Sequence, residues 1–195
     1  MTEEPYRWLE AIANRREYVA EQLKGGSPVL AASLPDGILL LGVGSGQSKV
    51  FELFDRHAMA GLGHPADLEK IRQSAIDAAH IEAFTRAPED VSLRRLISFG
   101  LSPQLKTNFE QIFSAPFLVE LLLAELGSDS AHDLFFRVHF DGSFPNAIGR
   151  HDAGLQPGRS RNRRPEVAGR SRARKDGPRR SGGPFVAGLV AAIGE

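Results

Sequence analysis

The residues of this sequence best suited to binding a metal ion or transferring a proton are six histidines. No two of them stand at the HxxxH spacing that places two ligands on one face of a helix. The chain also has no cysteine, which excludes a thiolate metal site and a disulfide framework. We therefore expect no metal site and only structural or surface roles for the histidines, which are His57, His64, His80, His132, His139 and His151.

The stretch Gly44-Ser45-Gly46 could suggest a loop that holds a phosphate group. It lacks the lysine and hydroxyl residue that follow the glycines in phosphate-binding loops. An ordinary loop is the better interpretation, and we expect no cofactor.

The apolar patterns along the chain predict the helices and strands that carry these residues. An amphipathic helix is predicted over Pro5–Lys24, ended by two glycines, because residues of one stripe recur at helical spacing: Trp8, Ile12, Arg16 and Val19. Two apolar runs joined by Pro35-Asp36-Gly37 then predict a hairpin, because glycine accepts the positive φ of a tight turn. The predicted hairpin strands are Val29–Leu34 and Ile38–Val43, and two further strands are expected at Lys49–Phe54 and Ala58–Gly63.

A long helix is predicted from Pro65 to Arg86. Proline suits a first helical position, and Asp67 places a negative charge at the positive end of the helix dipole. The expected buried stripe is Leu68, Ile71, Ala75 and Ala79.

A second helical pattern runs from Val91 to Phe113, with Pro103 inside it. Proline removes a backbone hydrogen bond, so we expect a kink or a break, with Ser102 capping the second helix. Strands are predicted at Phe117–Leu126 and Leu134–Phe140, the first apolar on both faces. Two sheets between two helical layers would bury such strands, which indicates an α+β fold.

Three stretches, KVFELFDR, AMAGLGHPADLEKIR and AFTRAPEDVSLRRL, closely resemble the α-type subunits of the 20S proteasome. The resemblance covers about residues 6–144 and then stops. It implies the four-layer αββα sandwich of the amino-terminal-nucleophile hydrolases, incomplete at the carboxyl terminus. It also implies a first domain at residues 1–144.

Residues 145–195 differ in composition from the rest of the chain. Gly, Ala, Arg and Pro make up 31 of these 51 residues, and the segment has 11 Lys or Arg against 4 Asp or Glu. Residues 1–144 have 13 against 20. Such a tail is typical of disordered, polyanion-binding segments, but an out-of-frame sequence or a functionless extension would have the same composition. The closing FVAGLVAAI predicts at most a short helix, so the strands at Phe117–Leu126 and Leu134–Phe140 should leave apolar surface uncovered.

The catalytic relatives in this family use an amino-terminal threonine as nucleophile, with a lysine nearby. The equivalent position here is Ser27, which lies behind 26 residues, and Val43 stands where an acidic partner would be needed. The only threonines are Thr2, Thr85 and Thr107. We therefore expect no catalytic residue. A hydrolase that cleaves itself before Ser27 remains an alternative, as does a binding module with a nucleic-acid-binding tail.

Lys49 corresponds to the lysine that, in this family, receives the carboxylate of an activator's carboxyl-terminal tail in a pocket between subunits. Position alone fits a surface lysine equally well. The Tyr-Asp-Arg gating motif of the family is missing ahead of Tyr6, which argues against a tight gate.

The resemblance thus implies a non-catalytic ring subunit that acts in assembly, gating and activator docking. Its partners would be copies of itself, β-type subunits and an ATPase or other activator. No apolar run reaches the roughly 20 residues of a membrane span, and none resembles a signal peptide, so we expect a cytoplasmic protein.

Overall fold

A computed structural model describes residues 5–44, 47–145, 152–155 and 187–191. The described elements are, in chain order, α1 (Pro5–Leu23), β1 (Val29–Leu34), β2 (Gly37–Val43), β3 (Val50–Phe54), β4 (His57–Gly63), α2 (Pro65–Thr85), the 3₁₀ turn η1 (Pro88–Asp90), α3 (Leu93–Arg95), the π-helical η2 (Leu96–Leu101), α4 (Ser102–Glu110), β5 (Val119–Glu125), β6 (Leu134–Val138), β7 (Asp152–Leu155) and β8 (Ala187–Ala191).

These strands form two sheets. The first has the order β7-β1-β2-β8 and the second the order β3-β4-β5-β6. Every pairing is antiparallel except that of β8, which runs parallel to β2. The predicted hairpin is confirmed: Leu34 pairs with Gly37, whose φ of 144° is one that other residues rarely adopt.

A first apolar core fills the space between the sheets. Alternate residues of β1 and β2 point inward, and β4, β5 and β6 supply the opposite wall. This inner layer is Val29, Ala31, Ile38, Leu40, Ala58, Ala60, Leu62, Leu122, Ala124 and Phe135. Val19 and Leu23 at the end of α1 complete it, so α1 closes one end of the sandwich.

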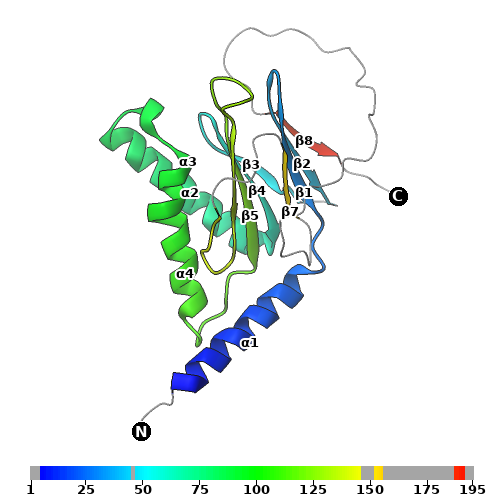
Figure 1. Cartoon of the computed structure of the whole chain (residues 1–195), viewed down its shortest axis with the longest axis vertical. Coiled ribbons are helices and arrows are strands. Elements are labelled where there is room, and N and C mark those ends of the chain that lie inside the picture. Colours follow the sequence, from blue (N-terminus) through cyan, green and yellow to red (C-terminus); the bar gives the residue numbers. More distant parts are fainter. Residues whose placement is uncertain (1–4, 45–46, 146–151, 156–186, 192–195) are drawn as a thin grey trace.

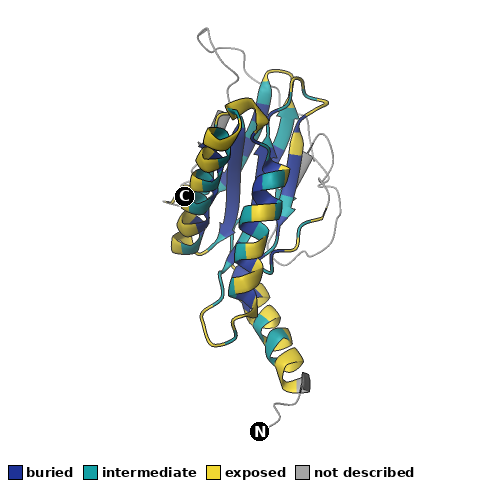
Figure 2. Cartoon of the chain, turned by 90° about the vertical axis from the view of Figure 1, so that its left-hand side faces the viewer, coloured by how far each residue is buried: buried dark blue, intermediate teal, exposed yellow. Residues whose placement is uncertain are grey.

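A second core lies between the β3-β4-β5-β6 sheet and the helices α2 to α4, which form one layer in Figure 1. The buried residues of α2 are the predicted stripe, Leu68, Ile71, Ala75 and Ala79. Figure 2 shows this buried face turned toward the strands, with exposed residues on the outside. The α+β fold with antiparallel sheets is therefore present, and the described residues form three layers, one helical and two of sheet.

A kink or a break was expected at Pro103, and the structure shows no break into two separate helices. Leu96–Leu101 winds as a π-helix and continues directly into α4, and this wider turn absorbs the proline. Ser102 has helical dihedral angles and does not cap; its hydroxyl donates to the carbonyl oxygen of Gly142 at 2.7 Å. Phe113 lies beyond the helix end and is almost wholly exposed, so the predicted helical pattern extends too far.

Two short parts of the tail do form strands. β7 pairs with β1, and β8 extends the same sheet beside β2, so the expected short helix in FVAGLVAAI is wrong for Ala187–Ala191. Val190 suits a strand, and pairing with β2 satisfies backbone groups that a short isolated helix would leave unpaired at its ends. The remainder of the tail lies outside the described residues.

The predicted location of uncovered apolar surface is also wrong. β5 and β6 are buried on both faces, because the helices cover one side and the other sheet covers the second. Among the described residues, the face without a helix is instead the outer face of β1 and β2. It carries the half-buried side chains Leu30, Ala32, Leu39, Leu41 and Val43.

Candidate functional site

Lys49 lies just ahead of β3, at the end of the sandwich where β1 begins and β2 ends. Its ammonium donates a hydrogen bond of 3.2 Å to the carbonyl oxygen of Ser27. Two glycines of the β2 end make room for the lysine stem: a Cβ at Gly42 would lie 3.3 Å from Lys49 Cβ, and one at Gly44 would lie 3.2 Å from Lys49 Cε. The sequence patterns did not indicate that these two glycines make room for Lys49.

The surroundings of Lys49 leave its ammonium able to bind an anion. Partial burial lowers the pKa of Lys49 from its ordinary value, and no carboxylate within the described ranges pairs with it. A carbonyl oxygen accepts one of its three protons, so two remain for a ligand. A partly desolvated ammonium of this kind suits a carboxylate.

Ser27 lies beside Lys49, but the contact involves the backbone of Ser27 and not its hydroxyl group. The group that faces the ammonium is the Ser27 carbonyl, and the Ser27 hydroxyl has no hydrogen-bond partner in the described part of the chain. The Ser27 nitrogen is part of the peptide bond after Gly26 and carries no free amine. Val43 pairs its backbone N–H with the Pro28 carbonyl at 3.1 Å and brings no acid. Within the described residues, no side chain accepts a hydrogen bond from the Ser27 hydroxyl.

The threonines and histidines are dispersed. Thr85 donates to the Ile81 carbonyl at the end of α2, Thr107 is exposed on α4, and Thr2 lies outside the described residues. Within the described ranges no three His, Asp or Glu side chains gather closely enough to hold a metal ion. His151 lies outside these ranges.

Most described histidines have structural contacts. His64 caps α2 by accepting from the Ala66 N–H at 3.3 Å, and the rings of His132 and His139 lie 2.8 Å and 2.9 Å from carboxylates. His57 is fully buried in β4, and its Nε2 lies 3.7 Å from Glu125. Burial opposes ionisation of Glu125, but the nearby His57 ring, the hydrogen bond from the Leu93 N–H and the charge of Arg56 outweigh it and lower the Glu125 pKa. At 3.7 Å the His57 ring is too far away to donate a good hydrogen bond, and neither ring nitrogen has a partner among the described residues. Glu125 therefore stays charged beside His57.

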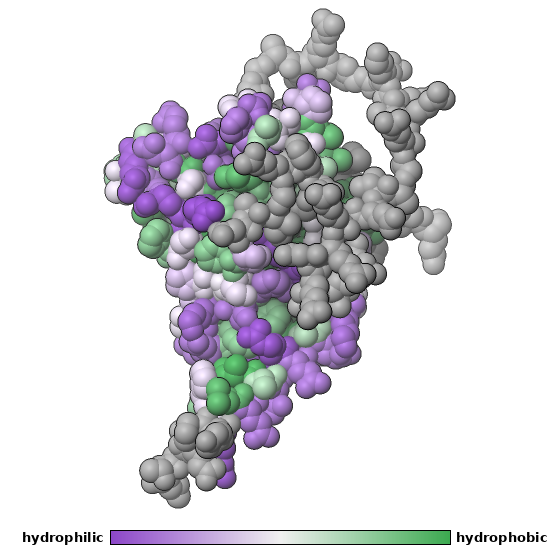
Figure 3. Space-filling view, viewed as in Figure 1, coloured by the Kyte–Doolittle hydropathy of each residue, from purple (hydrophilic) through white to green (hydrophobic). Residues whose placement is uncertain are grey.

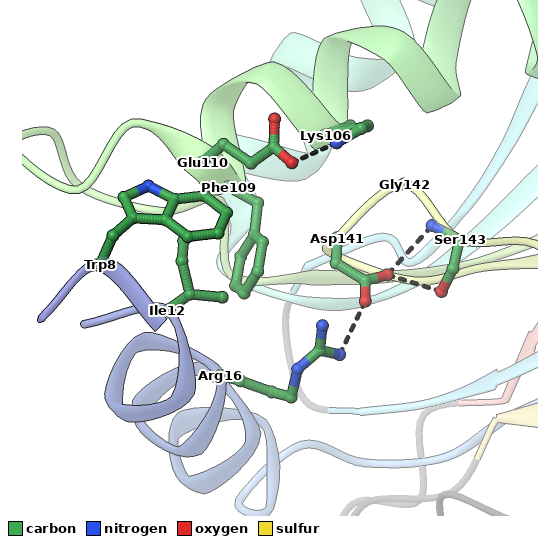
Figure 4. A pocket seen from close by; sticks show the side chains of 9 residues that line it. All are labelled: Trp8, Ile12, Arg16, Lys106, Phe109, Glu110, Asp141, Gly142 and Ser143. Atoms are coloured by element: carbon green, nitrogen blue, oxygen red, sulfur yellow. Dashed lines mark hydrogen bonds and ion pairs between the residues drawn. The ribbon is translucent and has the colours of Figure 1, made fainter. Parts of the chain in front are cut away.

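A second feature, not foreseen from the sequence, is a hollow of about 320 Å³ between α1, α4 and the turn after β6. Its lining is Trp8, Ile12, Arg16, Lys106, Phe109, Glu110, Asp141, Gly142 and Ser143. Figure 4 shows Arg16 reaching across to Asp141, while Trp8 and Ile12 face the hollow from α1. Trp8, on the apolar stripe of the predicted amphipathic helix, is 47% exposed.

No described helix combines the length and apolar character that crossing a bilayer requires.

Comparison with known proteins identifies relatives named Proteasome subunit alpha. The chain is 31% identical to a protein named Proteasome subunit alpha from Pseudarthrobacter chlorophenolicus, over 139 residues that make up 69% of this chain and 57% of the relative. The protein of the same name from Paenarthrobacter aurescens is 30% identical over 145 residues, which cover 72% and 60%. The match in Streptosporangium roseum is 29% identical over 189 residues, which cover 94% and 67%.

No family model matches the chain. The chain spans between about half and three fifths of the length of the first relatives it matches. The shared name and the level of identity confirm the resemblance that the sequence motifs indicated: this chain is a homologue of the proteasome α subunits.

Proposed function

We propose that this chain acts as a non-catalytic α-type ring subunit of a 20S-type proteasome core, with residues 1–144 as its α-type domain. The observation that carries the proposal is that α1 stands intact ahead of β1 and joins it through Gly26 and Ser27. An amino-terminal nucleophile needs a free amine as its base, and a preceding helix removes that amine.

The packing around Gly26 supports an uncleaved chain. Gly26 N–H donates to the Leu23 carbonyl at 3.1 Å, and a Cβ at Gly26 would lie 2.7 Å from Leu62 of β4. Val19 and Leu23 are buried in the first core. Cleavage before Ser27 would therefore release a helix end that the core needs.

Within this function, Lys49 serves as the receptor for an activator's terminal carboxylate. Its partial burial, its free donor capacity and its place at the end of the sandwich all suit that role. The activator would be an ATPase or another protein with an exposed carboxyl-terminal tail. Gating belongs to the same proposal, with a looser gate than in relatives that carry the Tyr-Asp-Arg motif, because that motif is missing ahead of Tyr6.

The partners proposed for the assembled protein are further copies of this chain and β-type subunits. The four-layer sandwich belongs to the same proposal: the outer face of β1 and β2 is where a fourth, helical layer would pack. A cytoplasmic location suits a ring of this kind.

Intact-mass measurement and a peptidase assay on the purified chain test the proposal together. We expect no peptide cleavage, and an intact mass that corresponds to a chain beginning at Met1 or Thr2. A species that begins at Ser27 and cleaves peptides would replace the proposal with a self-processed hydrolase. Co-expression with a β-type subunit should then yield a mixed ring, whereas a chain that never joins one would contradict the ring assignment.

A further inference from the structure

The helix α1 projects from the body of the domain, and only its last part is packed. Val19 and Leu23 are buried, whereas Trp8 and Leu9 are about half exposed. Figure 1 shows the helix leaving the sheets at an angle, and Figure 3 shows hydrophobic side chains on its exposed stretch. A helix with so little apolar contact needs another means of fixing its direction.

Apolar packing fixes the first half of α1 only weakly. Ile12 is partly buried against the first core, but Trp8 is half exposed, and both side chains line the hollow toward Phe109 of α4. An open space on this side would let the helix swing, unless other contacts hold it.

Arg16 provides one such contact. Its Nη1 lies 2.7 Å from Asp141 Oδ2, and its guanidinium carbon lies 5.3 Å and 5.9 Å from the ring centres of Phe109 and Phe140. The planar cation is thus paired with a carboxylate and stacked near two aromatic rings at once. The two paired residues are 125 positions apart in sequence, so the contact joins α1 to the turn after β6.

Arg15 provides a second contact in another direction. It donates to the Ser114 carbonyl at 2.6 Å and to the Asn108 carbonyl at 3.1 Å. Asn108 lies in the last turn of α4, and its carbonyl also accepts from the Gln111 N–H at 3.3 Å. Neighbouring arginines therefore hold α1 to two different elements.

The acceptor of Arg16 is itself rigidly placed. Asp141 Oδ1 accepts from the Ser143 N–H at 3.0 Å and from the Ser143 hydroxyl at 2.6 Å, which leaves Oδ2 for Arg16. Gly142 between them has a φ of 77° and packs against α4. The turn after β6 thus presents one carboxylate oxygen in a fixed direction.

We infer that Arg15 and Arg16 form a latch that sets the angle at which α1 leaves the domain, with Arg16 as the positioning residue and Asp141 as its counter-charge. The inference rests on the proposed function, in which α1 contacts a neighbouring subunit. A ring closes only if each helix has the same direction, so a latch on that direction controls assembly without adding to the core.

The test is amide hydrogen exchange of the full-length chain, with the anisotropy of Trp8, the only tryptophan, as a second readout. In Arg16→Ala, exchange over residues 8–18 should rise about five- to ten-fold, while β4 and β5 remain unchanged. Arg7→Ala is the matched control, because Arg7 is exposed on the same helix and has no partner among the described residues. Unchanged exchange in Arg16→Ala would overturn the latch.

The counter-charge gives an independent test. Asp141→Asn keeps an acceptor for Ser143 but removes the charge, so it should loosen α1 in the same way. The Arg16→Ala/Asp141→Asn double variant should exchange no faster than Arg16→Ala alone, since both remove one interaction. Additive effects would mean that the two residues act separately and would overturn the pairing.

Measurements of ring assembly distinguish failure of the latch from failure of the proposed function. Loss of rings together with faster α1 exchange in Arg16→Ala is the expected result. If deletion of residues 1–24 leaves the oligomer unchanged, the role of α1 in assembly fails, whatever the exchange data say about the latch.

Discussion

The ammonium of Lys49 lies 3.2 Å from the carbonyl oxygen of Ser27, which joins the start of β3 to the segment that precedes β1. In this arrangement the serine hydroxyl is left without a base, whereas the lysine keeps protons for another acceptor. The geometry therefore favours anion binding over nucleophilic catalysis at the same place.

Lys49→Ala should weaken docking of an activator tail but leave assembly intact. Loss of a hydrogen bond to a charged group costs about 1.5–3 kcal/mol, or roughly ten- to hundred-fold in affinity. Titration of a labelled tail peptide onto assembled rings measures the effect, with Lys24→Ala as the control because Lys24 is exposed directly after α1. An amidated peptide should bind both rings weakly. Equal affinity of the free-acid peptide for wild type and Lys49→Ala would make Lys49 an ordinary surface residue.

Deletion of residues 1–24 should abolish ring assembly. The exposed apolar residues of α1 require a cover, and the proposed ring supplies one. Mass photometry of the full-length and truncated chains decides the matter. The truncation also removes Val19 and Leu23 from the first core, so thermal unfolding is followed in parallel. Loss of rings counts only if the truncated chain still unfolds cooperatively.

Much of this fold could be predicted from apolar patterns. The α2 stripe and the β1–β2 hairpin follow from local spacing and turn chemistry, and both are confirmed. The π-helical segment at Leu96–Leu101 could not be predicted in this way. A proline inside a helical pattern predicts a kink or a break, and only the structure shows that a wider helical turn precedes the proline and that the helix continues. The uncovered sheet face was placed wrongly because its location depends on which sheet lies outside, and local sequence does not encode that order.

The candidate sites differ in the same way. Lys49 was found through a resemblance in its flanking residues, and the glycines that house its stem stand only five to seven positions away. The latch was missed because Arg16 and Asp141 are far apart in sequence and no local pattern links them. Arg16 falls on the predicted apolar stripe of α1, and a charged residue there is the one signal that was available.

Gly63→Ala should destabilise the fold strongly. Gly63 has a φ of 138°, and a Cβ there would lie 1.8 Å from the backbone oxygen of Leu118. Neither the backbone conformation nor the clash can relax without separating β4 from β5, so a cost of about 3 kcal/mol or more is expected. Gly25→Ala, where a Cβ meets nothing within 4 Å, should stay within about 1 kcal/mol of wild type. Urea unfolding of both variants provides the comparison, and equal midpoints would contradict the packing described at Gly63.

The latch should weaken in acid. Burial opposes ionisation of Asp141, but hydrogen bonds from Ser143 and Arg16 outweigh it, so the pKa of Asp141 is lowered. A carboxyl with a lowered folded-state pKa stabilises the fold above its ordinary pKa of about 3.9, and this contribution is lost as pH falls through the folded value. The Trp8 anisotropy of wild type should therefore exceed that of Asp141→Asn at pH 6. The difference should begin to shrink near pH 4 and vanish only when the pH is below the lowered pKa of Asp141. Lys106 and Glu110 line the same hollow but are present in both proteins. A difference that persists at pH 2 would mean that the charge of Asp141 does not hold α1.

Polar substitutions on the outer face of β2 should improve solubility at little cost to stability. Leu39 and Leu41 are half-buried there, while Ile38 and Leu40 point into the core between the sheets. Leu39→Thr with Leu41→Thr removes apolar surface that no described helix covers, and threonine suits a strand. The pair Ile38→Thr and Leu40→Thr makes the same chemical change one residue away, but it should cost about 2–4 kcal/mol per site because it leaves cavities and buried hydroxyls. Light scattering and thermal unfolding of the two double variants measure both effects. If the outer pair lowers the melting temperature as much as the inner pair, a further layer already packs on that face, and the three-layer description of the chain is incomplete.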